Sequence, residues 1–146
     1  MKVLDANVLL YASNKSADHH AGARAWLLGA LRGKESILIP WICSLAYLRI
    51  ATHPRAVPEP LSVSAAMTFL RTALVNARVV TGEPDHLHLD RVEALLAATG
   101  QGGNLVNDAH VAALALQYDA TVVSYDNDFS RFPGVRWELP PPVSED

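Results

Sequence analysis

Short apolar runs alternate along the chain with longer stretches in which apolar residues recur at helical spacing. The short runs predict strands at 3–4, 36–39, 78–80, 121–124 and 135–137. The longer stretches predict helices at 21–31, 43–51, 62–74, 84–100 and 107–118. Strands that alternate with helices of this length form a parallel sheet covered on both faces. We therefore predict an α/β fold with a parallel central sheet of four to five strands, flanked by helices on both faces.

Length and composition favour one folded domain. The chain has 146 residues, of which 50% are hydrophobic and 18% charged, so it can bury a core and is not intrinsically disordered. The single cysteine, Cys43, excludes a disulfide framework. We expect the domain to span residues 1–139, followed by a flexible tail at 140–146, PPPVSED. The chain lacks an apolar run of membrane-spanning length and a signal-peptide pattern, which predicts a cytoplasmic protein without a membrane partner.

The charge balance limits how the protein could meet nucleic acid. A formal net charge of −3 and a pI near 6.0 argue against a protein that coats nucleic acid with clustered basic residues. An enzyme that approaches nucleic acid through a bound divalent cation remains compatible with that charge, because the cation reverses the local field.

Acidic residues fall where the predicted strands end. Asp5 follows the first strand, and Asp126 and Asp128 follow the fourth, while Asp108 lies in the first turn of the helix that leads into it. The carboxyl ends of parallel strands share one edge of a sheet, so these side chains are expected to converge. Carboxylates that converge repel one another unless a cation lies among them, and oxygen ligands suit Mg²⁺ or Mn²⁺. The pattern indicates a divalent-metal centre for phosphate chemistry.

Each acid also has a local explanation. Asp5 could form a turn with Asn7 after the strand, Asp108 could favour the helix dipole, and 126–128 could be a polar turn. The coincidence of all of them at one predicted edge favours the metal centre, with Asp128 as its accessory member.

Four segments carry a further signal. They are VLDANVLLY from Val3, LRIATHPR from Leu48, NLVNDAHVAALA from Asn104 and TVVSYDNDF from Thr121. In this order they resemble the PIN-domain ribonucleases, specifically the VapC-type toxins of bacterial toxin–antitoxin pairs. The resemblance extends from about residue 2 to residue 137 and implies a single PIN-like domain.

The resemblance implies a Mg²⁺-dependent endoribonuclease, in which Mn²⁺ could substitute, that cuts tRNA or rRNA by metal-assisted hydrolysis and leaves a 5′-phosphate and a 3′-hydroxyl. A VapB-type antitoxin would neutralise it, and it would act as a homodimer. Its catalytic acids would be Asp5, Asp108 and Asp126. These three and Asp128 would hold the metal, and Asn7 and Ser124 would orient its ligands.

One position departs from the family pattern. PIN nucleases commonly carry a glutamate in the helix after the second strand, and Ala46 stands there. Three explanations of the alanine remain open. The chain could belong to a subgroup that lacks this glutamate, it could be an inactivated variant, or it could be a catalytically silent PIN domain that binds RNA or protein. The neighbouring acid Glu35 precedes the second strand and should lie at the opposite edge.

Basic residues give weaker signals. Arg49, Arg55 and Arg131 are candidates for binding RNA phosphates, although arginines near helix ends also occur as solvated residues that favour the dipole. His86 and His88, at the start of an amphipathic helix, are predicted to face solvent.

Overall fold

The computed structural model describes residues 1–143, in which short strands alternate with helices. The strands are β1 (Lys2–Leu4), β2 (Ile37–Leu38), β3 (Val79–Val80), β4 (Thr121–Val123) and β5 (Arg136–Glu138). The helices are α1 (Ala6–Ser13), α2 (His20–Arg32), α3 (Trp41–Ala51), α4 (Val63–Leu74), α5 (His88–Thr99) and α6 (Leu105–Gln117), and the 3₁₀ turn η1 (Asn127–Arg131) precedes β5. The predicted strands are all present within about a residue of their expected positions.

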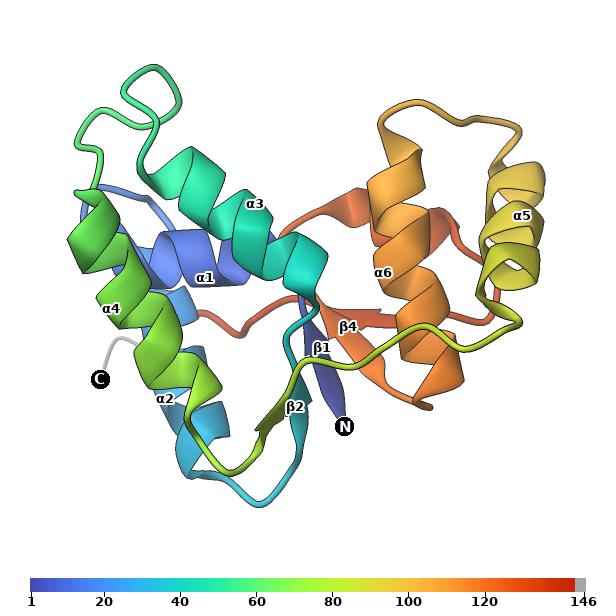
Figure 1. Cartoon of the computed structure of the whole chain (residues 1–146), viewed down its shortest axis with the longest axis horizontal. Coiled ribbons are helices and arrows are strands. Elements are labelled where there is room, and N and C mark those ends of the chain that lie inside the picture. The colour runs from blue at the N-terminus through green and yellow to red at the C-terminus, as the bar shows by residue number, and fades with distance from the viewer. Residues whose placement is uncertain (144–146) are drawn as a thin grey trace.

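The strands form one parallel sheet in the order β3-β2-β1-β4-β5 (Figure 1). In the central strand, Val3 lies opposite Leu38 of β2 on one side and Val122 of β4 on the other. The predicted α/β fold with a parallel central sheet is confirmed.

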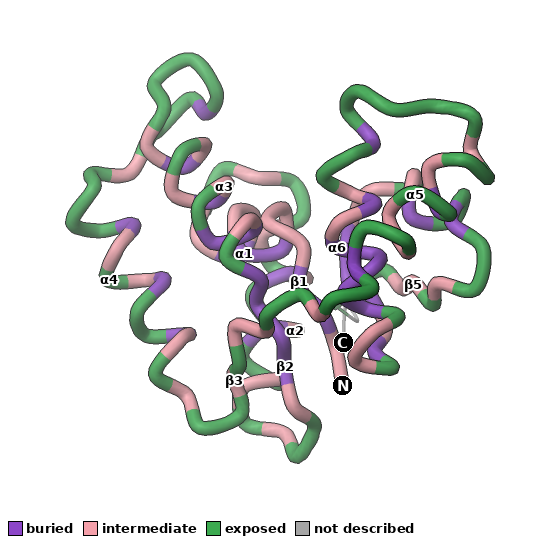
Figure 2. The backbone as a smooth tube through the Cα atoms, turned by 45° about the vertical axis from the view of Figure 1, so that its right-hand side comes forward, coloured by how far each residue is buried: buried purple, intermediate pink, exposed green. Residues whose placement is uncertain are grey.

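Alternation along the strands divides the buried core between the two faces of the sheet. Val3, Leu38 and Val122 belong to the core on the α5–α6 side, and Leu4 and Val123 to the core on the side of α1 to α4. Figure 1 shows these two groups of helices on opposite sides of the strands, and in Figure 2 the buried segments gather between them. The helices therefore cover both faces, as predicted.

Helix α1 is an element that the sequence analysis did not predict. Its sequence, ANVLLYAS, is apolar on most sides, and Val8, Leu9 and Ala12 are buried. Such a helix lacks the contrast between a polar and an apolar face on which a periodicity argument depends.

The last two helices begin at other residues than expected. Helix α5 starts at His88 instead of Pro84, because the backbone before it is tied to α6: the Asp85 N–H donates to Gln117 Oε1 at 3.1 Å. Helix α6 starts at Leu105, so Asn107, expected as the N-cap at the start of the range 107–118, lies inside its first turn. Asn104 occupies the cap position without a side-chain capping bond.

The predicted tail begins with a residue that packs against the domain. Pro140, the first residue of the predicted flexible tail, is buried, while residues 144–146 of that tail lie outside the described part of the chain. The boundary at residue 139 stays a prediction. Across residues 1–143, the structure contains no helix with the length and apolar content needed to cross a bilayer.

Candidate active site

The strand order places the candidate site between β1 and β4. From β1 the chain proceeds through β2 to β3 on one side of the sheet, and β4 and β5 occupy the other side. The carboxyl ends of the strands at such a reversal form the usual ligand-binding crevice of open parallel sheets. Asp5 directly follows β1, and Ser124 and Asp126 follow β4, so the topology gathers these side chains at one edge.

Three carboxylates from two segments meet at this edge. One oxygen each from Asp108, Asp126 and Asp128 lies within 4.8 Å of the others. Asp108 is in the first turn of α6, whereas Asp126 caps η1 by accepting a hydrogen bond from the Asp128 N–H at 2.8 Å. That capping bond makes a tight turn of the backbone, so that Asp126 and Asp128, only two residues apart, both direct a carboxylate oxygen toward Asp108.

Asp5 lies beside the three clustered carboxylates but is not one of them. Its Oδ1 accepts a hydrogen bond from the Ala6 N–H at 2.7 Å, which caps α1. Its Oδ2 accepts from Ser124 Oγ at 2.7 Å and from Asn7 Nδ2 at 3.0 Å. Asp5 thus caps α1 in place of the local turn with Asn7 that was considered for it. These bonds fix the carboxylate in one orientation beside Asp108, with which it lines a small cavity.

The hydroxyl of Ser124 connects the ends of the two central strands. Ser124 is fully buried, and besides donating to Asp5 its Oγ accepts hydrogen bonds from Asn7 Nδ2 and from the Asp126 N–H, both at 2.9 Å. Asn7 also accepts, through Oδ1, from the Tyr125 N–H at 3.2 Å. Ser124 and Asn7 thus hold the segments of Asp5 and Asp126 in a fixed relation.

The electrostatics of the site favour a cation. Burial and, after it, the nearby charges of Asp5, Asp126 and Asp128 together raise the pKa of Asp108 to about 7. Burial also raises the pKa of Asp5, against the hydrogen bonds from Ser124 and Ala6. A divalent cation among these groups would remove the repulsion. Oxygen donors alone fit a hard cation, so the residues present suit a metal of this class.

Ala46 faces the site. It lines, with Asp5, Cys43 and Asp108, a cavity of about 50 Å³. Its methyl group offers no ligand where the family pattern has a carboxylate. Glu35 does not replace it, because its carboxylate accepts a hydrogen bond from the amino group of Met1 at 2.7 Å, at the opposite edge of the sheet.

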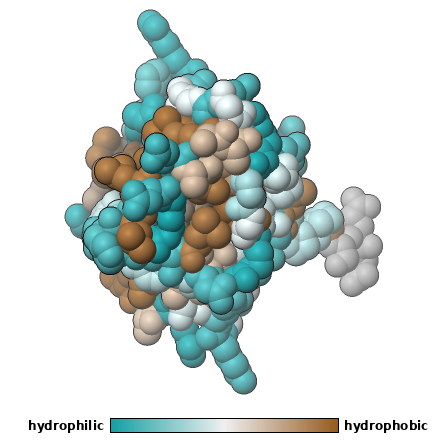
Figure 3. All heavy atoms as spheres, turned by 90° about the vertical axis from the view of Figure 1, so that its right-hand side faces the viewer, coloured by the Kyte–Doolittle hydropathy of each residue, from teal (hydrophilic) through white to brown (hydrophobic). Residues whose placement is uncertain are grey.

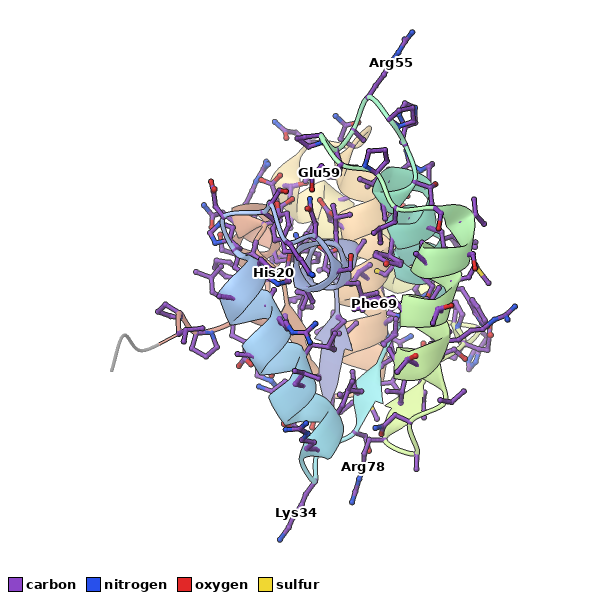
Figure 4. All side chains as sticks on the ribbon, turned by 90° about the vertical axis from the view of Figure 1, so that its left-hand side faces the viewer. His20, Lys34, Arg55, Glu59, Phe69 and Arg78 are labelled. Atoms are coloured by element: carbon purple, nitrogen blue, oxygen red, sulfur yellow. The ribbon has the colours of Figure 1, made fainter. Side chains whose placement is uncertain are left out.

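The candidate phosphate-binding arginines lie at different places. Arg131 contacts the cluster: its Nη1 is 3.4 Å from Asp128 Oδ1, and its Nη2 donates to Gln101 Oε1 at 3.0 Å. Arg49 is exposed on α3, and Arg55 extends into solvent from the loop after that helix (Figure 4). The structure thus brings Arg131 to the carboxylates and leaves Arg49 and Arg55 on the outer surface.

The expectation that His88 faces solvent is wrong, although His86 is exposed. His88 is only 7% exposed, and its Nε2 lies 2.8 Å from Nδ1 of His110 on α6. The later start of α5 turns His88 inward, because it becomes the first helical residue and packs on the neighbouring helix.

Sequence reasoning also missed an aromatic group formed by Tyr11, His19 and Tyr125. Only Tyr125, between Ser124 and Asp126, gave a signal by its position.

Comparison with known proteins agrees with this geometry. The PIN domain family profile matches residues 2–135. Ribonuclease VapC37 of Mycobacterium tuberculosis is 46% identical over 141 residues, covering 97% of this chain and 98% of that protein, and Ribonuclease VapC33 of the same species is 34% identical over 142 residues, covering 96% and 98%. Among solved structures, VapBC2 from Rickettsia felis bound to a promoter DNA fragment is similar, with a TM-score of 0.65 and 25% identity over 94% of this chain and 97% of that one.

Proposed function

The chain belongs to the PIN-domain family, and from that membership we propose that it is a metal-dependent endoribonuclease, the toxin of a VapBC-type pair. The observation that carries the proposal is the convergence of Asp108, Asp126 and Asp128 beside Asp5 at the reversal point of the sheet. Relatives that match nearly the whole chain bear the name ribonuclease, and similar solved structures bear the name VapBC.

RNA is the proposed substrate and a VapB-type antitoxin the proposed partner. We infer tRNA or rRNA as the substrate class, action in the cytoplasm, and a homodimer as the working form. The formal net charge of −3 at neutral pH fits an enzyme that engages RNA locally, through a cation and a few arginines, better than one that coats it.

We infer that the metal is Mg²⁺, for which Mn²⁺ could substitute, held by Asp5, Asp108, Asp126 and Asp128. When bound, the metal would polarise the phosphoryl oxygens and lower the pKa of the attacking water. The residues of the chain supply the rest. Ser124 and Asn7 hold the Asp5 carboxylate in place, and the capping bond of Asp126 directs Asp128 toward the same point. Arg131 offsets charge on Asp128 at the rim, and we propose that Arg49 and Arg55 contact phosphates farther along the strand.

A catalytically silent PIN domain is the less favoured alternative. Its support is Ala46, which leaves the site without the family glutamate. Against it stands the grouping of acids around Asp108, whose pKa is raised to about 7 by burial and then by its acidic neighbours. A binding domain without a metal gains nothing from carboxylates that repel one another. Asp128 belongs to the cluster and supplies a further carboxylate to a site that lacks the family glutamate.

Cleavage of total RNA by the purified chain tests the proposal. We expect cleavage that requires Mg²⁺ and stops on addition of EDTA. Asp5→Asn and Asp108→Asn should each reduce the rate by roughly 100-fold or more, because a neutral amide binds the metal poorly. Asp119→Asn, at an exposed aspartate that precedes β4 at the strand end opposite the carboxylates, is the matched control and should cleave like the parent.

The variant Ala46→Glu distinguishes the three explanations of Ala46: a tolerated departure from the family pattern, an inactivating change, or a silent binding domain. Activity in the parent would identify Ala46 as a tolerated departure. Activity that appears only in Ala46→Glu would identify the alanine as the inactivating change in a nuclease. If neither chain cleaves RNA at any Mg²⁺ or Mn²⁺ concentration, the ribonuclease proposal is refuted and the silent binding domain takes its place.

A further inference from the structure

The rings of Tyr11, His19 and Tyr125 form an aromatic group that the proposed chemistry does not use. His19 stacks on Tyr125, with ring centroids 4.4 Å apart and planes inclined by 21°. Tyr11 meets the same tyrosine edge-on at 5.2 Å and lies 5.6 Å from His19. We call this group of three rings the aromatic ledge.

The aromatic ledge is built onto the candidate active site. Tyr125 lies between Ser124 and Asp126 in the chain, and its N–H donates to Asn7 Oδ1. Tyr11 lies one helical turn beyond Asn7 on α1, so both residues occupy the same face of that helix. One continuous surface therefore leads from the residues that hold Asp5 to the ledge.

The ledge borders open space. His19 and Tyr125 line a hollow of about 570 Å³. Its other walls come from the residues around the start of α2, at Asp18, Ala21 and Gly22, and from the end of the described chain, at Leu139, Pro140, Pro142 and Val143. His19 and Tyr11 line a second hollow, of about 470 Å³, toward the loop that follows α3. His19 is exposed and lies between the two hollows. Figure 4 views this side of the molecule, where the labelled neighbour His20 marks the start of α2.

The position of the His19 ring is not explained by the helix that it precedes. His19 is the N-cap of α2, a position at which small polar side chains usually bond to the helix backbone, and it makes no such bond. Its neighbour His20 fastens the two helices instead, with Nδ1 2.9 Å from the Tyr11 carbonyl oxygen. The ring of His19 is thus available to a ligand without loss of the helix cap.

We propose that the aromatic ledge binds a nucleobase of single-stranded RNA, next to the phosphate that is cleaved. The inference rests on the proposed function and deepens it, because it assigns a base-binding role to the ledge. Aromatic side chains bind unpaired bases by stacking, with little dependence on base identity. The stacked pair of His19 and Tyr125 leaves an exposed ring on which a further planar ring can lie, and the hollow is large enough for a base.

A nucleobase fits the ledge better than a protein segment does. The two rings are nearly parallel, an arrangement that a third flat ring extends, whereas a peptide would fill the hollow with side chains of mixed shape. Tyr125, one wall of the hollow, lies between Ser124 and Asp126 in the chain, so a strand whose phosphate lies at the carboxylates brings a nearby base toward the ledge.

Binding of short single-stranded RNA to the chain carrying Asp108→Asn tests the inference, because this background keeps the ledge and the candidate phosphate-binding arginines but should cleave RNA too slowly to consume it. We expect His19→Ala to weaken binding of a nine-nucleotide oligouridylate roughly tenfold, the loss of one stacking partner, and His19→Phe to retain it. His86→Ala, which removes an exposed histidine away from the ledge, is the matched control and should bind normally. In a series of oligonucleotides that each lack the base at one position, we expect His19→Ala to make no difference to binding when the missing base is the one that stacks on the ledge. At every other position the loss caused by His19→Ala should remain.

The outcomes separate this inference from the proposed function. If the parent cleaves RNA but His19→Ala binds the oligonucleotide as tightly as the background chain, the base-binding role is overturned while the ribonuclease stands. That result would favour a protein segment as the occupant of the hollow. If the abasic series gives the same loss at every position, His19 acts on the backbone and the stacking role is overturned. A parent that neither binds nor cleaves RNA overturns both.

Discussion

The buried hydroxyl of Ser124 serves three partners at once. It donates to Asp5 and accepts from Asn7 and from the Asp126 backbone. Ser124→Ala removes this junction, so Asp5 loses one of the bonds that orient it. We expect cleavage to slow roughly 10- to 100-fold, the usual cost of losing a group that positions a metal ligand. The free energy of unfolding should fall by about 1–3 kcal/mol, because buried partners lose a hydrogen bond.

Ser124→Thr is the control for that prediction, because it keeps the hydroxyl and should retain most of the activity. Rates are measured on total RNA and stabilities by urea denaturation. Equal activity of the parent and Ser124→Ala would show that the hydroxyl does not position Asp5 for the reaction.

The raised pKa of Asp108 predicts how stability depends on pH without metal. The folded chain keeps the Asp108 proton up to about pH 7, whereas the unfolded chain releases it near 3.8. Between these values the folded state binds more protons, so its contribution to the free energy of unfolding falls as the pH rises. In EDTA, Asp108→Asn should therefore be more stable than the parent above pH 7, by about 1–3 kcal/mol, and equally stable near pH 4.

Urea denaturation in EDTA at several pH values measures this difference. Addition of Mg²⁺ should then stabilise the parent and leave the variant nearly unchanged, since only the parent binds the cation well. A variant that is less stable than the parent at pH 8 in EDTA would contradict the repulsion inferred for the cluster.

The residue scale also shows how far the sequence predicts the site. Asp5 and Asp126 could be located because each directly follows a buried apolar strand, and parallel strands present such residues at one edge. His19 could not be found in this way. Its contact with Tyr125 depends on how the start of α2 packs beside the end of β4, and no spacing along the chain encodes that distance.

At the scale of elements, two histidines join α5 to α6. Nε2 of His88 and Nδ1 of His110 are 2.8 Å apart, so one ring donates to the other. Burial lowers the pKa of both imidazoles, with a further contribution from Arg91 at His88 and from His88 at His110. The pair is neutral in the folded chain. It stabilises the fold fully above the ordinary value of 6.5, and this contribution is lost as the pH falls below 6.5.

His88→Gln tests the pair, because the glutamine Nε2 can replace the ring nitrogen without titrating. We expect a stability within about 1 kcal/mol of the parent at pH 7.5 and a smaller loss on going to pH 5.5. The measurement is the urea midpoint at both pH values. Parallel curves for the two proteins would show that His88 does not contribute to the acid sensitivity.

The elements differ in how well the sequence specifies them. The strands are short, apolar and bounded by polar residues, so each stands out. Helix α1 does not, because Val8, Leu9 and Ala12 are buried on one face and Leu10 and Tyr11 pack partly against the same core. The start of α5 could not be predicted from the sequence either, because it depends on tertiary contacts such as the hydrogen bond from the Asp85 N–H to Gln117 on α6.

At the scale of the whole molecule, the α5 side presents apolar surface. Leu89 is 78% exposed and Leu87 43%, and Figure 3 shows hydrophobic atoms gathered on this side. Monomeric proteins seldom leave apolar side chains grouped on one face unless a partner covers them. We expect the apolar residues from Leu87 to Leu96 to form the dimer face, and we expect Leu89→Glu to convert a homodimer into a monomer.

Light scattering coupled to gel filtration measures this change. Val75→Glu alters a residue that is 80% exposed at the end of α4, on the other side of the sheet, and should leave the mass unchanged. A dimer that persists in Leu89→Glu would place the interface elsewhere.

The hydrogen bond between Ser124 and Asp5 joins residues 119 positions apart, and it has a consequence during synthesis on the ribosome. The central strand emerges first, but β4, its neighbour on one side, emerges only after most of the chain has been translated. The carboxylates cannot come together before then, and closing so long a loop is slow. A nascent or prematurely terminated chain therefore carries no assembled site, and any toxicity begins only once the final strands have been made.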